Sequence, residues 1–221
     1  MEKIKTSRNQ KLKLAIYLAL SVAFLSALTM PLSNKQSVNP NGTFIVEAGK
    51  KLNNELTGKD QQAEESKAAF NEAYTVFMSP RCMNCHPAGD VPLQGDDSHL
   101  HAQGVKRGQD GNGLYAMKCK NCHQDTDIAG DHMPPGHPNW RLPPATRRMV
   151  FEGKSAKELA TTFKDMKSTG FKTMGEFIKH VEDDSLVKHS FTYGSRPPLS
   201  HEEFVAKIKE WIAKGAAIPD N

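Results

Sequence analysis

The sequence predicts a mainly α-helical protein with long loops, folded as a single domain around a bound group. Three segments with helical spacing of apolar residues follow capping patterns, and no segment alternates apolar and polar residues as a half-buried strand does. Two cysteine motifs also begin only 37 residues apart, at Cys82 and Cys119. A separate domain needs about 50 residues or more, so both motifs should share one core.

The first segment, residues 1–33, is typical of an export signal or an N-terminal membrane anchor. A basic stretch precedes an apolar run from Leu14 to Met30. The run is long for a signal core and short for a span, so both alternatives stay open. We expect the rest of the chain to lie in the periplasm, soluble or tethered to the inner membrane.

Residues 34–58 are polar with little periodicity and are expected to form a flexible tether. The domain is expected to cover residues 59–221. It should open with a helix from about 60 to 78, because Phe70, Ala73 and Phe77 recur at helical spacing.

Both cysteine motifs have the form Cys-x-x-Cys-His, and together they contain every cysteine in the chain. The residues are Cys82-Met83-Asn84-Cys85-His86 and Cys119-Lys120-Asn121-Cys122-His123. This motif attaches haem through its two thiols, and its histidine becomes the proximal iron ligand. The sequence therefore predicts two covalently bound haem c groups, with His86 and His123 on the irons.

Four cysteines can also serve other purposes in a protein. The spacing suits a four-cysteine zinc site, and two disulfides can form in an exported protein. Neither site requires a histidine after each pair. A thioredoxin-like pair would need a strand before it and a helix after it, and neither copy shows that pattern.

The second half of the domain should contain a proline-rich strap and three helices. Residues 132–144 are stiff and extended, either lying against a haem or forming a surface loop. The helices begin at capping patterns in which a hydroxyl and a carboxylate are three residues apart. These pairs are Ser155 with Glu158, Thr173 with Glu176, and Ser200 with Glu203.

Each iron would still have an open axial position. His180 lies beside the apolar face of its helix, and Met133-Pro134 is similar to the distal-ligand segment of class I cytochromes. We expect His101 and His180 as distal ligands because they come from separate segments. The alternatives are His132 and then Met133.

Residues from about 80 to the end resemble small exported dihaem proteins labelled as cytochrome-like subunits of isoquinoline 1-oxidoreductase type. The similar segments are the two motifs, Pro92-Leu93-Gln94, 101–108, 132–140, and His180 with 184–187. The resemblance implies histidine ligands at His101, His132 and His180, which ranks them above the methionines. Lys188–Phe191 replaces the family's Trp-Gly-Trp.

These observations predict a periplasmic dihaem c-type cytochrome that relays single electrons and is not itself an enzyme. Its partners would be a dehydrogenase, with a molybdenum hydroxylase among the candidates, and a respiratory acceptor. The alternative is a haem enzyme that reduces peroxide or another small oxidant at an open haem site. Nucleic acid is not expected as a partner. The net charge of +4 comes from residues 1–33, and the remainder carries 24 basic and 24 acidic residues.

Overall fold

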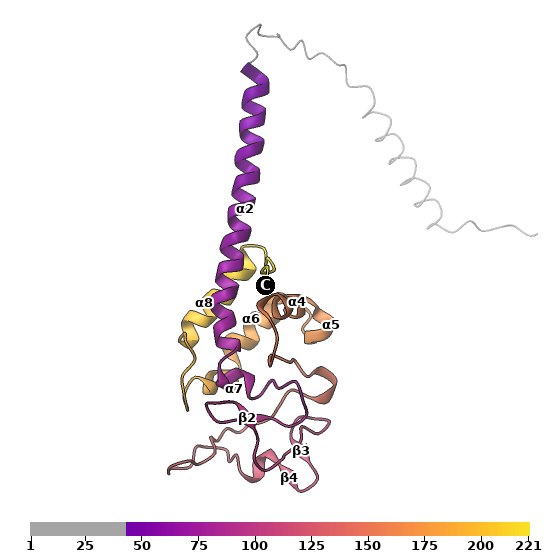
Figure 1. Cartoon of the computed structure of the whole chain (residues 1–221), viewed down its shortest axis with the longest axis vertical. Helices are drawn as coiled ribbons and strands as arrows, with labels where there is room; N and C mark the ends of the chain where they lie inside the picture. Colours follow the sequence, from indigo (N-terminus) through magenta and orange to yellow (C-terminus); the bar gives the residue numbers. More distant parts are fainter. Residues whose placement is uncertain (1–42) are drawn as a thin grey trace, which may run out of the picture. The chain divides into compact units, whose positions relative to one another are not determined.

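The computed structural model describes residues 43–221 of the chain, with side chains from residue 53 onward. The predicted signal or anchor, residues 1–33, lies outside the described residues. Residues from Lys51 to the C-terminus form one compact unit. Helices dominate it and strands are few, which confirms the mainly helical prediction (Figure 1).

The first helix is longer than the sequence suggested. Helix α2 spans Thr43–Phe77, so residues 43–58 of the expected tether are helical in the structure. Side chains from residue 53 to 62 are exposed, and Lys59 pairs with Glu55 at 3.0 Å. An apolar stripe along a helix indicates that the helix packs against another element. Residues 53–62 are exposed, so this part of α2 carries no such stripe. Local pairs at i,i+4 and helix-forming residues support a helix without such a stripe.

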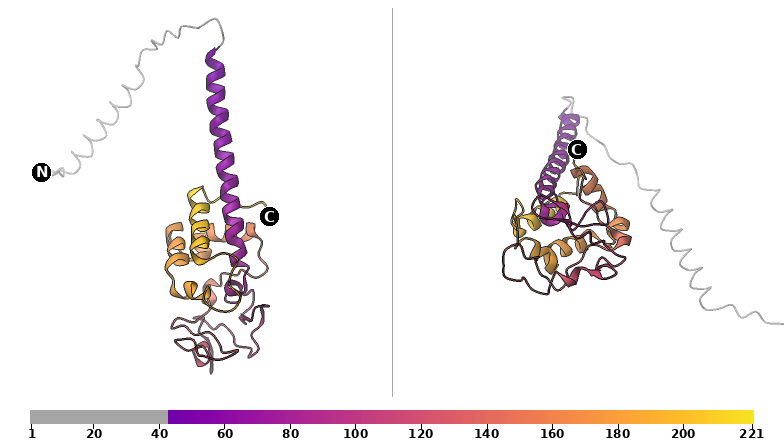
Figure 2. Two further views of the ribbon diagram at one scale, coloured as in Figure 1. Left: turned by 90° about the vertical axis from the view of Figure 1, so that its left-hand side faces the viewer. Right: turned by 60° about the horizontal axis from the view of Figure 1, so that its bottom comes forward.

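A helical region, defined here as residues 63–83 and 149–221, contains the packed core. It combines the end of α2 with α4 (Ala156–Lys164), α5 (Met166–Thr169), α6 (Met174–Asp183), α7 (Ser185–Ser190) and α8 (His201–Ala213). These helices lie around the lower part of α2 in two views (Figures 1 and 2). Phe70, Phe163 and Trp211 are almost completely buried at the centre. Phe70 touches both other rings, with centroid distances of 6.2 and 4.6 Å.

The three helix starts predicted from capping patterns are correct. Ser155 and Ser200 form reciprocal capping boxes with Glu158 and Glu203. Thr173 also caps α6, but the Glu176 carboxylate accepts from the Lys172 amide instead of closing a box. Helix α7 was not predicted; Asp184 begins it by accepting hydrogen bonds from two backbone amides.

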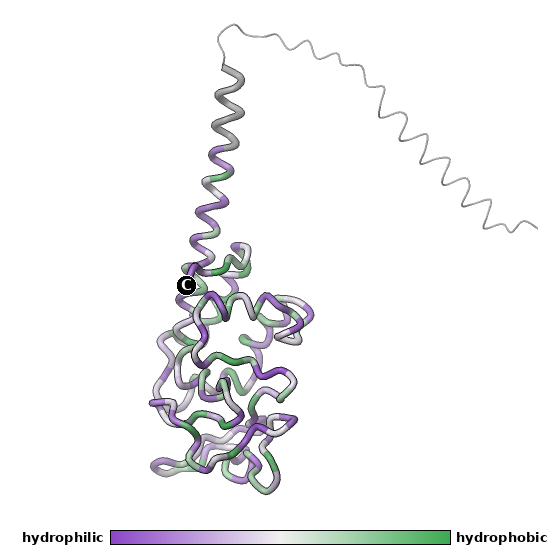
Figure 3. Tube along the Cα trace, turned by 45° about the vertical axis from the view of Figure 1, so that its right-hand side comes forward, coloured by the Kyte–Doolittle hydropathy of each residue, from purple (hydrophilic) through white to green (hydrophobic). Residues whose placement is uncertain are grey.

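A loop region, residues 84–148, carries most of both cysteine motifs. It contains two hairpins of two-residue strands, β1 (Leu93–Gln94) with β2 (His99–Leu100) and β3 (Gly113–Leu114) with β4 (Met117–Lys118). Short 3-10 turns, η1 (Cys119–Asn121) and η2 (Ala145–Arg147), complete it. Hydrophobic and hydrophilic stretches alternate closely along this part of the chain (Figure 3). None of residues 84–148 belongs to the main hydrophobic cluster.

In the part of the chain that the structure describes, no helix is both long and apolar enough to cross a membrane.

Candidate functional site

The first cysteine motif begins on a helix that is anchored to the core. Helix α3 (Pro80–Met83) follows α2 after a sharp turn at Ser79, whose hydroxyl donates to the Val76 carbonyl at 2.7 Å. Proline suits the first position of a helix because no hydrogen bond to its nitrogen is needed there. Cys82 packs against the main hydrophobic cluster. The first motif therefore sits on the edge of the helical region.

The ring of His86 is fixed by a carbonyl and an aromatic face. Its Nδ1 lies 2.7 Å from the Met149 carbonyl oxygen, and its ring stacks on Phe151 at 3.9 Å between centroids and 13°. Desolvation lowers the pKa of His86 to about 4, so the imidazole is neutral. A neutral ring that donates from Nδ1 presents the lone pair of Nε2 to a metal.

The second cysteine motif rests on turns of the loop region. The β3–β4 hairpin leads into η1, where the Cys119 amide donates to the Asn112 carbonyl at 3.1 Å. The Asn121 side chain donates to the Ala116 carbonyl at 2.6 Å. Cys122 is exposed, whereas Cys82 is half-buried. Local hydrogen bonds therefore hold the second motif in place, whereas packing against the core holds the first.

The ring of His123 repeats the arrangement of His86. Its Nδ1 lies 2.7 Å from the Pro135 carbonyl oxygen, and its ring stacks on Trp140 at 4.1 Å and 9°. Both contacts come from the predicted proline-rich strap. Desolvation again lowers the pKa of the histidine. Histidines that bind metals usually donate their second ring nitrogen to a carbonyl or carboxylate, so both proximal candidates have the support that a ligand needs.

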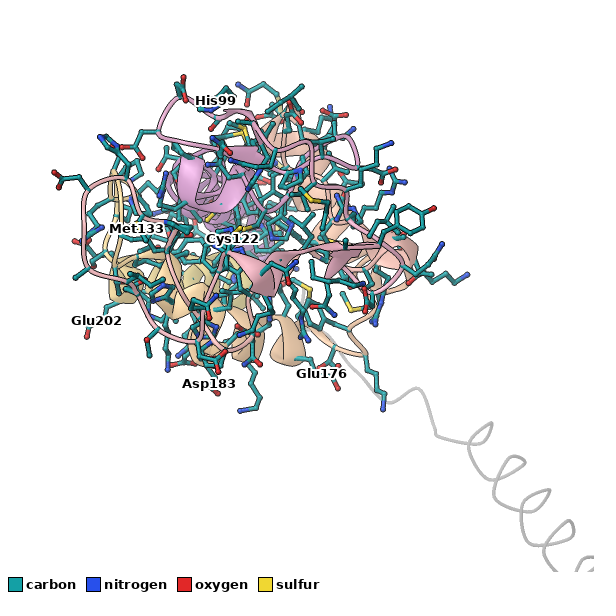
Figure 4. All side chains as sticks on the ribbon, turned by 90° about the horizontal axis from the view of Figure 1, so that it is seen from below. His99, Cys122, Met133, Glu176, Asp183 and Glu202 are labelled. Atoms are coloured by element: carbon teal, nitrogen blue, oxygen red, sulfur yellow. The ribbon has the colours of Figure 1, made fainter. Side chains whose placement is uncertain are left out.

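Both motifs contribute to one large cavity of about 870 Å³. Its lining includes Cys85, Cys119, Cys122 and His123. Cys122 and Met133 are labelled on adjoining parts of the loop region in the view from below (Figure 4). The cavity is within the size range of sites that bind cofactors, roughly 300–1,000 Å³. Three of the four cysteines and one proximal histidine thus face a space large enough for a bound group, whereas Cys82 and His86 do not line it.

His101 is the candidate distal ligand that best fits this cavity. It lines the cavity, and its ring centroid lies 6.4 Å from that of His123 with 60° between the planes. Two imidazoles on one metal have centroids roughly 6 Å apart, given metal–nitrogen bonds of about 2.0 Å. Its Nδ1 is buried without a hydrogen-bond partner among the described residues. The residues present therefore fit a bis-histidine site at the second motif.

His180 lies in a different place. It is on α6, outside the large cavity, in a shallow hollow with Phe171. Its Nδ1 is 3.5 Å from an Asp184 carboxylate oxygen, and its side chain is about half exposed. It lies close enough to His86 to help lower the pKa of that histidine. His101 thus lies beside His123 at the second motif, whereas His180 lies outside the cavity that both motifs line.

The two alternatives, His132 and Met133, also line the cavity. Both side chains are exposed, and His132 has a left-handed backbone with φ of 60°. Asn, Asp and His tolerate this conformation better than branched residues do. The structure brings both side chains to the cavity edge and does not bury them.

Sequence reasoning missed several polar groups at the site. His189 lies in the last turn of α7, and its Nε2 is buried 3.6 Å from Asp127 without a hydrogen bond among the described residues. The buried arginines Arg81 and Arg107 also went unnoticed. No periodicity marks these two arginines, because their partners lie at distant positions in the sequence. Only the position of Arg81, next to Cys82, could have drawn attention.

The cysteines do not form a compact ligand cluster. All four are free thiols in the structure. Within residues 43–221, no group of three or more His, Cys, Asp or Glu side chains converges closely enough to hold an ion. A four-cysteine zinc site would be such a group.

Comparison with known proteins gives no match to any family model, curated protein or solved structure.

Proposed function

We propose that this chain is an exported dihaem c-type cytochrome that passes single electrons between a dehydrogenase and a respiratory acceptor. The observation that supports it most strongly is the repeated environment of His86 and His123. Each ring stacks on an aromatic side chain and donates its Nδ1–H to a carbonyl oxygen at 2.7 Å. Each follows a Cys-x-x-Cys pair. A haem, when bound, supplies the one-electron chemistry.

The chain's own residues would then have separate tasks. The cysteines would tether the groups, and the carbonyls of Met149 and Pro135 would fix the tautomer and orientation of the two histidines. We assign His101 to the second motif, because its ring lies 6.4 Å from that of His123, and His180 to the remaining first motif, because its charge contributes to the lowered pKa of His86. Two occupied axial positions favour electron transfer over small-molecule chemistry, because no site is open to substrate.

The export signal and a periplasmic location belong to the same proposal. They rest on the basic and apolar residues of 1–33 and on the oxidising compartment in which exported cysteines are handled. A periplasm-dependent reporter fused after Asn221 should be active, and activity of a cytoplasm-dependent reporter there would overturn this part.

The central test is the mass and spectrum of the purified protein. Denaturing mass spectrometry should show the polypeptide plus two haem masses, and the reduced spectrum should not change with carbon monoxide. His101→Ala and His180→Ala should each open one haem to carbon monoxide, whereas His132→Ala should not. One haem, or bound zinc, would refute the cytochrome. Carbon monoxide binding by the parent protein would favour the haem enzyme instead.

A further inference from the structure

The side chain of Arg107 is the most buried cation near the motifs. It is 1% exposed. Its two terminal nitrogens donate to the carbonyls of Pro143 at 2.8 Å and Gly89 at 3.1 Å, while Nε is buried without a hydrogen-bond partner. Backbone carbonyls are neutral, so these contacts position the guanidinium without cancelling its charge. Arginine keeps that charge in proteins.

One carboxylate faces two guanidiniums at this place. Asp90 Oδ1 lies 2.9 Å from Arg148 and 3.8 Å from Nε of Arg107. Asp90 is half exposed, so water screens much of its charge. Charges buried in the protein are screened far less than exposed ones. The local balance is therefore positive.

Arg81 is a second buried cation, directly before Cys82. Its side chain is 7% exposed and stands over the ring of Tyr193, with 4.9 Å from Cζ to the centroid. It pairs with Asp96 at 2.6 Å, but Asp96 is half exposed and also binds Ser195. Nε of Arg81 is buried without a partner and the residue lines the large cavity.

Both arginines lie close to the first motif. Arg81 is on α3 directly before Cys82, and Arg107 donates to the carbonyl of Gly89, which follows His86 closely in the chain. At the second motif, Lys118 directly precedes Cys119, and Asp110 is next to Gly111, whose carbonyl accepts from Cys119 Sγ. These two charges have opposite signs and are exposed. The two motifs therefore differ in the net charge of their surroundings.

We propose that Arg107 and Arg81 hold the reduction potential of the haem on the first motif above that of the haem on the second. This inference rests on the proposed function. Reduction adds one electron, supplied by the partner dehydrogenase, and lowers the charge of the haem by one without moving a proton. Nearby buried cations disfavour the more positive oxidised form, and burial and net charge are known levers on haem potentials. Electrons should therefore collect at the first motif.

The test is a spectroelectrochemical titration of the holoprotein. Nuclear Overhauser contacts from haem methyl protons to Phe151 or to Trp140 assign each transition to its motif, since those rings stack on His86 and His123. In the parent, the first-motif haem should have the higher potential. Arg107→Met should lower that transition and leave the other nearly unchanged. Arg107→Lys, which keeps the charge, should restore most of it. Arg148→Gln, at an exposed position, should have a smaller effect.

Arg81→Met provides an independent measurement if Arg107→Met does not fold, and it should also lower the first-motif transition. Equal potentials in the parent, a reversed order, or equal shifts of both transitions would overturn the proposal. So would an unshifted first transition in Arg81→Met. Failure of the cytochrome itself is distinguishable, because the mass spectrum would then lack two haems before any titration begins.

Discussion

The helical region fills its core with its own side chains, whereas the loop region lines most of a cavity of about 870 Å³. In the helical region Phe163 contacts four other phenylalanine rings. In the loop region, by contrast, backbone segments approach each other closely. A Cβ at Gly136, for example, would collide with the Thr126 carbonyl. Apolar burial can therefore stabilise the helical region by itself, whereas the loop region would gain stability from the haems proposed above.

Removing the second pair of thiols should give the largest difference between the two regions. In Cys119→Ala/Cys122→Ala the protein should lose one haem mass, and backbone amides of residues 84–148 should exchange hydrogen much faster. Amides of α4, α6 and α8 should keep their protection, because their core does not include this motif. Hydrogen-exchange mass spectrometry measures both regions at once. Equal loss of protection in the two regions would contradict the division.

The reverse experiment weakens the helical region. Phe163→Ala should cost about 3–5 kcal/mol of unfolding free energy, the usual cost of emptying an aromatic site in a core. Tyr115→Ala is the matched control in the loop region, where the ring is 89% exposed, and should change stability by about 0.5 kcal/mol or less. Urea denaturation followed by circular dichroism compares them. Similar costs for the two variants would mean that the core does not lie where the packing places it.

The smallest effect concerns a helix cap. Ser200→Ala should destabilise α8 by about 1 kcal/mol, because the Ser200 hydroxyl accepts from the Glu203 amide. Ser185→Ala serves as the control, since that exposed hydroxyl has no hydrogen-bond partner among the described residues. The same denaturation curves give both values. A Ser200→Ala curve that overlays the control would show that the cap contributes little to the helical region.

Sequence reasoning worked best where a residue's role is local. The hydroxyls of Ser155, Thr173 and Ser200 mark helix starts because their partners lie within one turn. The start of α2 was missed because residues 34–58 show little apolar periodicity, and residues 53–62 of this helix are exposed in the structure.

At the site, the two motifs and their histidines could be found from spacing alone. Their supports could not be found in the same way. Met149 and Phe151 hold His86 from residues more than 60 positions away, and only the fold brings them together. The predicted strap supplied Pro135 and Trp140 because it follows His123 closely. The cysteine pairing with haem itself stays a prediction.

The difference in packing between the two regions has a consequence for degradation of the protein in the cell. If the proposed function is correct, a chain exported without its haems would keep a folded helical region and expose the segment from 84 to 148. Exposed, unstructured segments are where proteases cut first. The rate of proteolysis follows the fraction of molecules in which this segment is unfolded. Attachment of the haems would lower that fraction and so protect the chain from degradation. Only correctly assembled molecules would then accumulate.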